Sequence, residues 1–343
     1  MGEAELGRDR EGDVRFDIRY RTSFTYDDLV RESQNELRAC PMSDENQQLV
    51  SYRVSTSPSA RVLSFTDYWG TRVDAFGVRE PHLSLEVTAE ASVETKHRPL
   101  LTVAPRGESL SHPGFVDEHV EYLGRSPHCG WGEGVTAAAR SAASLGGSGV
   151  VSQVLAVHRA VHAALVYAPG ATAIGIEVEE VLAKGEGVCQ DYAHLAVAMC
   201  RAIGIPARYV SGYLFTLSDA SGEDTEADVV RVQTHAWFEA AIPGFGWLAL
   251  DPTNSQEVGL RHVKIGHGRD YDDVPPMRGV FAGGAVPEVE VTVEIRRMAA
   301  TATPRTSPPP SLVRTPVMPH LRNGAEPPDD QALQHQHHAQ QQQ

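Results

Sequence analysis

A cysteine stands where a glycine-rich turn passes into a predicted helix. Residues 185–195 read Gly-Glu-Gly-Val-Cys-Gln-Asp-Tyr-Ala-His-Leu, with Cys189 at the junction. From this point apolar or small residues recur at steps of three and four, the period of a helix that buries one face: Cys189, Tyr192, Ala193, Ala196, Met199, Cys200 and Ile203. The first turn of a helix carries unpaired backbone N–H groups and the positive end of the helix dipole. Because this environment stabilises a thiolate, we predict that Cys189 is a nucleophile.

A cysteine nucleophile needs a base, and the base needs a third group to orient it. His194 is the nearest histidine in the sequence. Five residues along a helix, however, place it about 140° around the axis from Cys189, so we predict a structural role for it. His235 is the better base. It lies in a predicted strand over residues 229–242, and Asp251 ends the next predicted strand.

A hairpin would bring His235 and Asp251 together. Residues 243–246 read Pro-Gly-Phe-Gly, a turn sequence, and lead into the strand at 246–251. If the hairpin folds about residue 243, His235 and Asp251 face each other, because each lies eight residues from the centre. Opposed residues have Cβ atoms about 4.5–5.5 Å apart, whereas a slip of one residue would turn Asp251 to the other face. Trp237 lies on the His235 face of its strand, and we expect it to wall the site.

The chemistry predicted from these side chains is acyl transfer. Cys189 attacks an amide carbonyl, the amine leaves with a proton from His235, and water or a second amine resolves the thioester. Backbone N–H groups at the helix start, including that of Cys189, would stabilise the oxyanion, and Tyr167 and Gln190 are candidates for a further donor. Asp191 lies in the first turn, where the dipole favours a carboxylate, and is predicted to support the site. The reaction needs neither a cofactor nor a metal ion, and we expect none.

The composition limits the class of partner. The chain has 343 residues, 41% of them hydrophobic, enough for two domains with their own cores. Its formal net charge of −15 argues against nucleic acid or an anionic membrane as the main partner, and the amide chemistry implies a protein or peptide substrate. No apolar run is long enough to span a membrane, and residues 1–13 lack the apolar segment of a signal peptide, so we predict a cytoplasmic protein. Four cysteines are too few for a disulfide framework, so we expect reduced thiols.

The sequence pattern divides the chain into four parts. Residues 14–97 contain short predicted strands with turns between them, and strict alternation of apolar and polar residues at 83–93, typical of an antiparallel sandwich. Residues 98–150 are predicted as a linker with short helices, and residues 151–297 as the catalytic unit, with helices followed by strands. Residues 298–343 are rich in Pro, Gln and His and are predicted to be disordered. The predicted fold class is α+β: an N-terminal antiparallel β-sandwich, then a core whose nucleophile helix packs on an antiparallel sheet.

Two other groups of residues have side chains that can bind metal, but neither has the spacing of a known site. His158 and His162 lie one helical turn apart, without the glutamate of a zincin and without a third ligand nearby. We expect core or boundary positions for both. Asp270, Asp272 and Asp273 lack the spacing and the glycine of an EF-hand loop, so we predict a solvated acidic turn.

At the reactive residues the chain resembles the transglutaminase-like superfamily in its bacterial form. The matching segments follow the order of that family's nucleophile helix and following strand, its histidine strand and its aspartate strand: residues 187–195 and 204–209, 234–237, and 247–254. The resemblance implies a papain-like, transglutaminase-like core. It also implies Cys189 as nucleophile, His235 as base and Asp251 as the orienting group.

The resemblance covers roughly residues 14–295. Residues 38–41, with the strands around them, resemble the β-rich N-terminal region that accompanies these bacterial proteins. Residues 262–265 and 268–276 resemble their C-terminal segment. The chain departs from the family mostly in the alanine-rich stretch at 135–148 and in the tail, and neither includes a predicted catalytic residue.

Three functional hypotheses remain open from the sequence, and the first of them, acyl transfer by Cys189, has two possible outcomes. Water at the thioester gives peptide or amide hydrolysis, whereas an amine acceptor gives protein cross-linking and requires a site that keeps water out. The resemblance implies that bacterial relatives are often regarded as protease-like, so we predict hydrolysis. A binding or scaffold protein that keeps the fold without turnover is expected to lack triad members, but all three are present. A metal hydrolase built on His158 and His162 would be inhibited by chelators and indifferent to Cys189→Ala.

Overall fold

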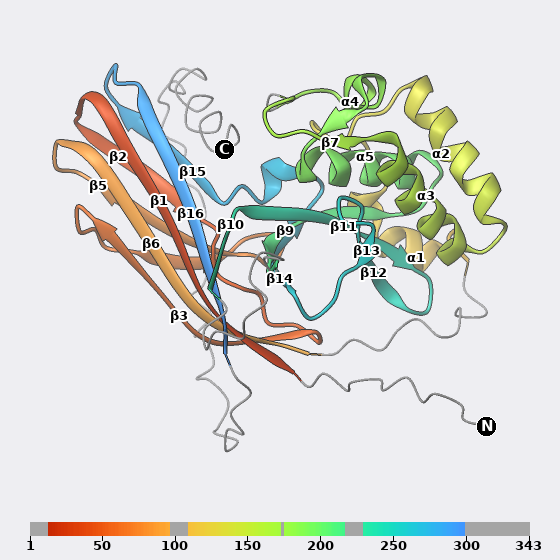
Figure 1. The fold of residues 1–343 in the computed structure, drawn as a ribbon, viewed down its shortest axis with the longest axis horizontal. Helices are drawn as coiled ribbons and strands as arrows, with labels where there is room; N and C mark the ends of the chain where they lie inside the picture. Colours follow the sequence, from red (N-terminus) through yellow and green to blue (C-terminus); the bar gives the residue numbers. More distant parts are fainter. Residues whose placement is uncertain (1–12, 97–108, 173–174, 217–228, 299–343) are drawn as a thin grey trace, which may run out of the picture.

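The computed structural model describes residues 13–96, 109–172, 175–216 and 229–298. The acidic and small residues at 218–228 predict an exposed loop, and this segment and nearly all of the predicted tail lie outside these ranges. Long strands form one side of the molecule and helices the other, with a further sheet between them (Figure 1). In the ranges described, no helix combines the length and the apolar character needed to cross a bilayer. The fold class is α+β, as predicted.

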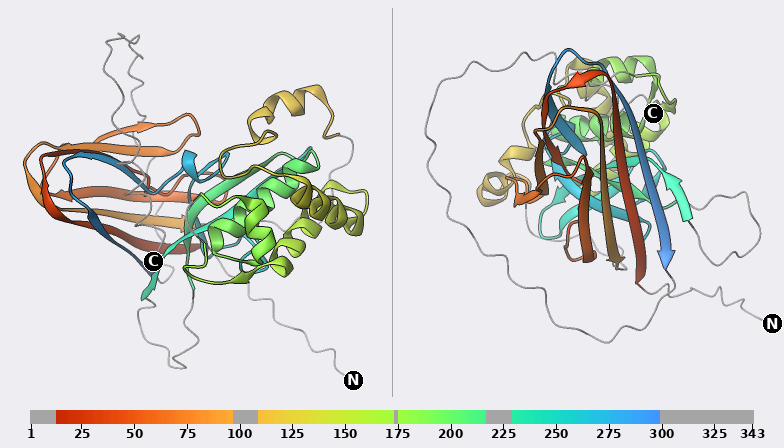
Figure 2. Two further views of the ribbon diagram at one scale, coloured as in Figure 1. Left: turned by 90° about the horizontal axis from the view of Figure 1, so that it is seen from above. Right: turned by 90° about the vertical axis from the view of Figure 1, so that its left-hand side faces the viewer.

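The long strands form an antiparallel β-sandwich, which Figure 2 shows from two directions. One sheet has the order β10-β16-β1-β6-β3 and the other the order β15-β2-β5-β4. Their bounds are β1 Val14–Val30, β2 Glu32–Leu37, β3 Gln47–Ser57, β4 Leu63–Thr66, β5 Arg72–Val78, β6 His82–Thr95, β10 Val229–Val232, β15 Met277–Ala282 and β16 Pro287–Met298. Inward and outward side chains alternate along β1, so that Phe16, Ile18 and Tyr20 are buried in the core of the sandwich.

Strands from the second half of the chain complete this sandwich. β16 pairs with β1, β15 with β2, and β10 with β16. Both sheets therefore combine strands from the predicted sandwich range, 14–97, with strands from residues beyond 228. The prediction of one strand over 229–242 is wrong. The segment divides at Gln233 into β10 and β11 because its two halves pair with different neighbours, β16 and β9.

The second sheet region is the platform for the helices. Its order is β13-β12-β11-β9-β14. The bounds are β9 Ala207–Leu214, β11 Thr234–Ile242, β12 Gly246–Asp251, β13 Gln256–Glu257 and β14 His262–Gly268. Helix α5, Cys189–Ala202, packs on β9 and β11, as predicted for the nucleophile helix. The other helices are α1 Pro113–Glu118, α2 Glu133–Gly146, α3 Val150–Ala164 and α4 Val178–Lys184, with single 3₁₀ turns η1 at Val120–Tyr122 and η2 at Tyr271–Asp273.

Helix α5 is the centre of this part of the molecule. Every residue from Asp191 to Arg201 is buried, whereas the sequence predicted one buried face. The difference arises because α2, α3 and α4 cover the side of α5 that faces away from the sheet. The buried guanidinium of Arg201 donates to the backbone carbonyls of Ala207, Gly124 and Arg269, so its charge is accommodated by hydrogen bonds.

The sandwich and the platform sheet share a hydrophobic core. Tyr213, Val263 and Ile265 of the platform belong to the same cluster of buried residues as the inward side chains of β1 and β6. The ring of Phe215, just after β9, lies 5.2 Å from the ring of Phe16 of the sandwich. This packing fixes β9 and β14, and hence the histidine strand beside β9, against the sandwich.

Candidate active site

Cys189 begins α5, and its neighbours fix the start of that helix. Val188, the residue before it, is extended. The carboxylate of Asp191 accepts hydrogen bonds from the N–H of Val188 at 2.8 Å and from the hydroxyl of Thr172 at 2.6 Å. A Cβ at Gly187 would lie 2.8 Å from the Cβ of Asp191, so glycine permits this close approach. Asp191 therefore holds the turn in front of the thiol.

Hydrogen bonds connect the imidazole of His235 to the thiol of Cys189 on one side and to the carboxylate of Asp251 on the other. His235 Nε2 lies 2.9 Å from Asp251 Oδ2. The ring also hydrogen-bonds to the Cys189 side chain. Because Nε2 faces Asp251, we assign this second bond to Nδ1. Burial alone would lower the pKa of His235, but the hydrogen bonds to Asp251 and Cys189 raise it to about 10. The charged imidazolium is therefore favoured at neutral pH.

The hairpin that joins His235 to Asp251 is shifted from the predicted register. Ile242 pairs with Gly246, which leaves residues 243–245 as the loop and centres the hairpin on residue 244 rather than 243. The predicted direct opposition of His235 and Asp251 is therefore wrong, because the loop holds three residues. Continuing the register places Asp251 across from residue 237, two positions from His235. A shift by an even number keeps Asp251 on the same face, so the side chains still meet.

Asp251 is fully buried, and both of its carboxylate oxygens accept hydrogen bonds. Besides His235, Oδ2 accepts from Nε2 of His262 at 3.2 Å and from the side-chain amide of Asn254 at 2.8 Å. Oδ1 accepts from the backbone N–H groups of Thr253 at 3.0 Å and Asn254 at 3.2 Å. Burial alone would raise the pKa of Asp251, but the hydrogen bonds from His235 and His262 hold it well below its usual range. The carboxylate is thus ionised and held in one orientation.

His262 is a member of this network that the sequence reasoning missed. The backbone N–H of Gly259 donates to its Nδ1 at 3.2 Å, which leaves Nε2 as the nitrogen that donates to Asp251. Burial lowers the pKa of His262, so the neutral ring is favoured. The contact between His262 and Asp251 could not be predicted from hairpin pairing, because β9 and β11 separate β14 from β12 in the sheet. The sequence signal that could have pointed to His262 is that it begins the segment 262–265, which resembles the C-terminal segment of the bacterial proteins.

The side chains of His235, Asp251 and His262 also have the composition of a metal site. Their nearest ligand atoms lie within 4.8 Å of one another. However, the Nε2 atoms of both histidines face the same carboxylate oxygen, at 2.9 and 3.2 Å. Two N–H donors around one acceptor satisfy all three groups. We therefore interpret the cluster as a hydrogen-bond network.

Trp237 backs the histidine rather than walling the cavity. Its indole is buried, with its ring centroid 6.2 Å from that of His235 and 5.4 Å from that of His262. Gly212 of β9 pairs with His235, and a Cβ at that position would lie 2.4 Å from the Trp237 ring. Glycine at 212 therefore allows the indole to lie across β9 and support the imidazole.

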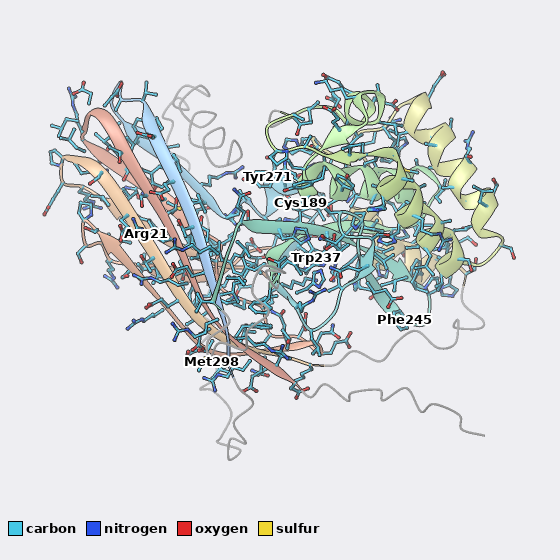
Figure 3. All side chains as sticks on the ribbon, viewed as in Figure 1. Arg21, Cys189, Trp237, Phe245, Tyr271 and Met298 are labelled. Atoms are coloured by element: carbon cyan, nitrogen blue, oxygen red, sulfur yellow. The ribbon has the colours of Figure 1, made fainter. Side chains whose placement is uncertain are left out.

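Cys189 lies where two cavities meet. The larger, about 560 Å³, is also lined by Tyr167 and Asn254. The smaller, about 50 Å³, is also lined by Tyr20 of the sandwich. His235 and Gln190 line both cavities, whereas Asp191 and Trp237 line neither. Figure 3 shows the labelled Cys189 beside Tyr271 of the smaller cavity, at the seam between the strands and the helices.

Tyr167 and Gln190 come to the site from adjacent short strands and the helix. Tyr167 ends β7, Val166–Tyr167, which pairs in parallel with β8, Glu186–Gly187, directly before the cysteine turn. Gln190 is the second residue of α5. Both line the larger cavity together with Cys189, and their role as oxyanion donors stays a prediction.

Two cavities of about 440 and 690 Å³ lie over the sandwich sheets, and neither is lined by a cysteine or a histidine.

His158 and His194 are buried, as predicted, whereas His162 is exposed, contrary to the prediction, because it lies on the outer side of α3. His158 and His162 of α3 hydrogen-bond to the backbone carbonyls of Asp251 and Pro252, each at 3.0 Å. They anchor the chain just after the aspartate strand. His194 accepts the backbone N–H of Tyr271 at 3.2 Å, away from the thiol.

The acidic turn differs from the prediction of a solvated segment. Asp270 is buried and accepts the backbone N–H of His128 at 3.0 Å. Asp272 lies 3.0 Å from the His128 ring, and Asp273 pairs with Arg269 at 2.9 Å. The carboxylates fail to project together into water because each has a protein partner that fixes the turn against the platform.

Comparison with known proteins places this architecture in a family. A family model for the bacterial transglutaminase-like N-terminal region matches residues 16–94, and one for the transglutaminase-like superfamily matches residues 138–252. A Mycobacterium leprae protein of uncharacterised activity is 34% identical over 285 residues, which cover 83% of this chain and 99% of that protein. A Mycobacterium tuberculosis protein, also uncharacterised, is 32% identical over 310 residues, 85% and 96% of the two chains.

Two similar proteins have names that refer to an activity. The crystal structure of a proposed cysteine protease from Cytophaga hutchinsonii superimposes with a TM-score of 0.65, at 24% identity, over 86% of this chain and 94% of that one. A protein-glutamine gamma-glutamyltransferase from Pseudomonas aeruginosa is 36% identical over 103 residues, which cover 27% of this chain and 14% of that protein. The chain therefore belongs to the transglutaminase-like superfamily, and it has the N-terminal region found in bacterial members.

Proposed function

We propose that Cys189, His235 and Asp251 form a catalytic triad that cleaves amide bonds through a thioester, with water as the final acceptor. The observation that best supports the proposal is the hydrogen-bonded line from the thiol through the imidazole to the buried carboxylate. The thiol lies where two cavities meet, so a substrate carbonyl and an acceptor have separate routes to it. A protein or peptide amide is the substrate class that suits this chemistry.

The first half of the proposed reaction forms the thioester. Sulfur attacks the carbonyl carbon, and the carbonyl electrons move to oxygen. The N–H groups of Asp191 and Tyr192 are the first to bond within the helix, to the carbonyl of Val188. The N–H of Cys189 precedes both of these donors, so we assign it to the oxyanion. When the intermediate collapses, the C–N bond breaks. The leaving nitrogen takes the proton from His235.

The second half of the reaction releases the acid. Once sulfur is bound in the thioester, the contribution of Cys189 to the raised pKa of His235 is lost, so the neutral ring that can accept a proton is more readily populated. His235 takes a proton from water as the water oxygen bonds to the acyl carbon. The C–S bond then breaks, and the thiolate and imidazolium are restored. Asp251 stabilises the charged ring at both stages without accepting its proton.

Transfer to a protein amine is the second candidate function. It rests on the Pseudomonas aeruginosa relative, a protein-glutamine gamma-glutamyltransferase, whose similarity covers 27% of this chain. The first half-reaction is the same for both candidates, so only the acceptor distinguishes them.

The test uses a glutamine-containing peptide with and without a primary amine, followed by mass spectrometry of the products. Hydrolysis gives a deamidated or cleaved peptide in both samples, whereas transamidation gives an amine adduct. Cys189→Ala is expected to abolish every product. Cys200→Ala is the matched control, since Cys200 lies in the same helix but is fully buried, and it is expected to retain activity. If Cys189→Ala forms product as fast as the wild type, the triad proposal is wrong.

A further inference from the structure

Five of the eleven residues that line the smaller cavity beside the thiol carry a hydroxyl. Its lining brings together β1 of the sandwich, β9 of the platform and the η2 turn: Tyr20, Tyr209, Ser211 and Tyr271 join Cys189 and His235. These four hydroxyl-bearing residues are each at least nine-tenths buried, and the hydroxyl-bearing Thr234, which also lines the cavity, is partly buried. A polar lining at this depth is costly unless it serves hydrogen bonding, so it points to a small polar occupant.

The size of this cavity restricts what can enter. Its volume is about 50 Å³, against about 560 Å³ for the cavity lined by Tyr167 and Asn254. A cavity needs roughly 10–15 Å³ of such space to hold one water molecule. The smaller cavity therefore suits a few water molecules rather than a lysine side chain, whereas the larger one can take a substrate side chain.

Tyr20 provides the second observation. Its side chain is 1% exposed, and in the part of the chain that the structure describes its hydroxyl has no hydrogen-bond partner. Burial raises the pKa of Tyr20, so the hydroxyl keeps its proton and can donate. Buried hydroxyls normally have a partner in the protein or in bound water. A polar molecule in the cavity would supply the one that Tyr20 lacks.

We propose that the small cavity holds the water that resolves the thioester, and that Tyr20 of the sandwich binds this water. The proposal rests on the proposed function and deepens it, because it names the acceptor and gives the N-terminal region a part in the site. His235 lines the same cavity and is the base that takes the proton of this water. The water oxygen bonds to the acyl carbon, the C–S bond breaks, and Cys189 leaves as the thiolate. Because this water is held beside the thioester, the site favours hydrolysis over transfer to a protein amine.

The test separates acylation from deacylation with p-nitrophenyl acetate. The burst of p-nitrophenolate reports formation of the acyl-enzyme, and the steady rate reports its hydrolysis. In Tyr20→Phe the burst rate constant is expected to stay within about twofold of wild type. The steady rate is expected to fall by about tenfold, the effect of losing one buried hydrogen bond to the water. Added hydroxylamine, an acceptor supplied from solution, is expected to restore turnover and give acetohydroxamate.

Thr71→Val is the matched control for Tyr20→Phe. Thr71 is also buried, directly before β5 of the sandwich, and its hydroxyl also has no partner in the described ranges, but it does not line the cavity. It is expected to change neither rate. Ser211→Ala, from the β9 side of the cavity, provides a second variant should Tyr20→Phe fail to fold, and it is expected to slow the steady rate selectively.

The outcomes distinguish this inference from the proposed function. One outcome is that the wild type shows a burst, and that Tyr20→Phe either lowers the burst rate constant and the steady rate by the same factor or changes neither. In that case the water site is wrong and the triad stands. An equal effect of Thr71→Val would also overturn the water site, since it would reflect packing in the sandwich. If the wild type gives no burst and Cys189→Ala behaves like it, the triad and the water site both fail.

Discussion

His262 donates from Nε2 to Oδ2 of Asp251 at 3.2 Å, the same oxygen that accepts from His235. The backbone N–H of Gly259 fixes the tautomer that permits this donation. His262 does not line either cavity beside Cys189. We therefore regard it as a positioning residue, which acts on the reaction through the orientation and charge of Asp251.

Replacement of His262 tests that role. His262→Phe keeps a ring but removes the donor, and we expect kcat/KM to fall by about 10- to 100-fold. His262→Gln keeps an N–H donor and is expected to recover most of the loss. A carboxylate with one donor fewer holds the His235 proton more strongly, so the alkaline limb of the pH profile in His262→Phe should move to higher pH. Equal losses in both variants, with an unmoved profile, would indicate a role in packing alone.

Asp251→Asn is expected to move the pH profile in the opposite direction. The pKa of His235 is raised from its ordinary value of 6.5 to about 10, so the active imidazolium form persists below that pH and is lost above it. We predict an alkaline limb of kcat/KM near pH 10 in the wild type. Asparagine removes the negative charge, so the limb should fall toward pH 6.5, and the rate at neutral pH should drop by about two to four orders of magnitude. A limb unchanged in Asp251→Asn would show that this carboxylate does not control His235.

The sequence allowed prediction of residues that a helix start or a hairpin positions. It did not allow prediction of residues whose contacts depend on how distant strands are arranged in the sheets. Cys189, His235 and Asp251 could be found because a helix start and one hairpin position them locally. The register was wrong by two residues, yet the contact held because an even shift keeps the sheet face. His262 could not be predicted, because two strands separate β14 from β12. Tyr20 could not be predicted either, because sandwich packing brings it to the thiol.

The four cysteines should differ sharply toward iodoacetamide at pH 6. Cys40, Cys129 and Cys200 are buried, and burial raises the pKa of each to about 12. Cys189 is partly exposed and contacts His235. We expect one alkylated site in the native protein and none in native Cys189→Ala, measured by peptide mass spectrometry. Labelling of Cys40 as fast as Cys189 would favour the alternative of a scaffold without a reactive thiol.

A buried ion network beneath the site should contribute strongly to stability. The Glu239 carboxylate pairs with Arg208 at 2.6 Å and with Lys264 at 2.8 Å. Burial alone would raise the pKa of Glu239, but Arg208 and Lys264 hold it well below its usual range, so its contribution is present at neutral pH and lost in acid. Glu239→Gln leaves two buried cations unpaired and is expected to lower the free energy of unfolding by about 3–5 kcal/mol.

Glu180→Gln is the control for that measurement. The Glu180–Lys184 pair lies on the surface of α4, with both side chains about half exposed, so its loss should cost less than about 1 kcal/mol. Urea unfolding at pH 7, followed by tryptophan fluorescence, measures both variants. A similar small effect of the two substitutions would show that the Glu239 network does not stabilise the fold.

The most direct test of the triad is the chemical identity of the acyl-enzyme. The protein is mixed with p-nitrophenyl acetate, quenched in acid during the burst, digested and analysed by mass spectrometry. The triad predicts an acetyl group on Cys189, formed in the wild type and at least about 100-fold more slowly in His235→Gln. Acetylation at another residue, or acylation of Cys189 at an unchanged rate in His235→Gln, would contradict it.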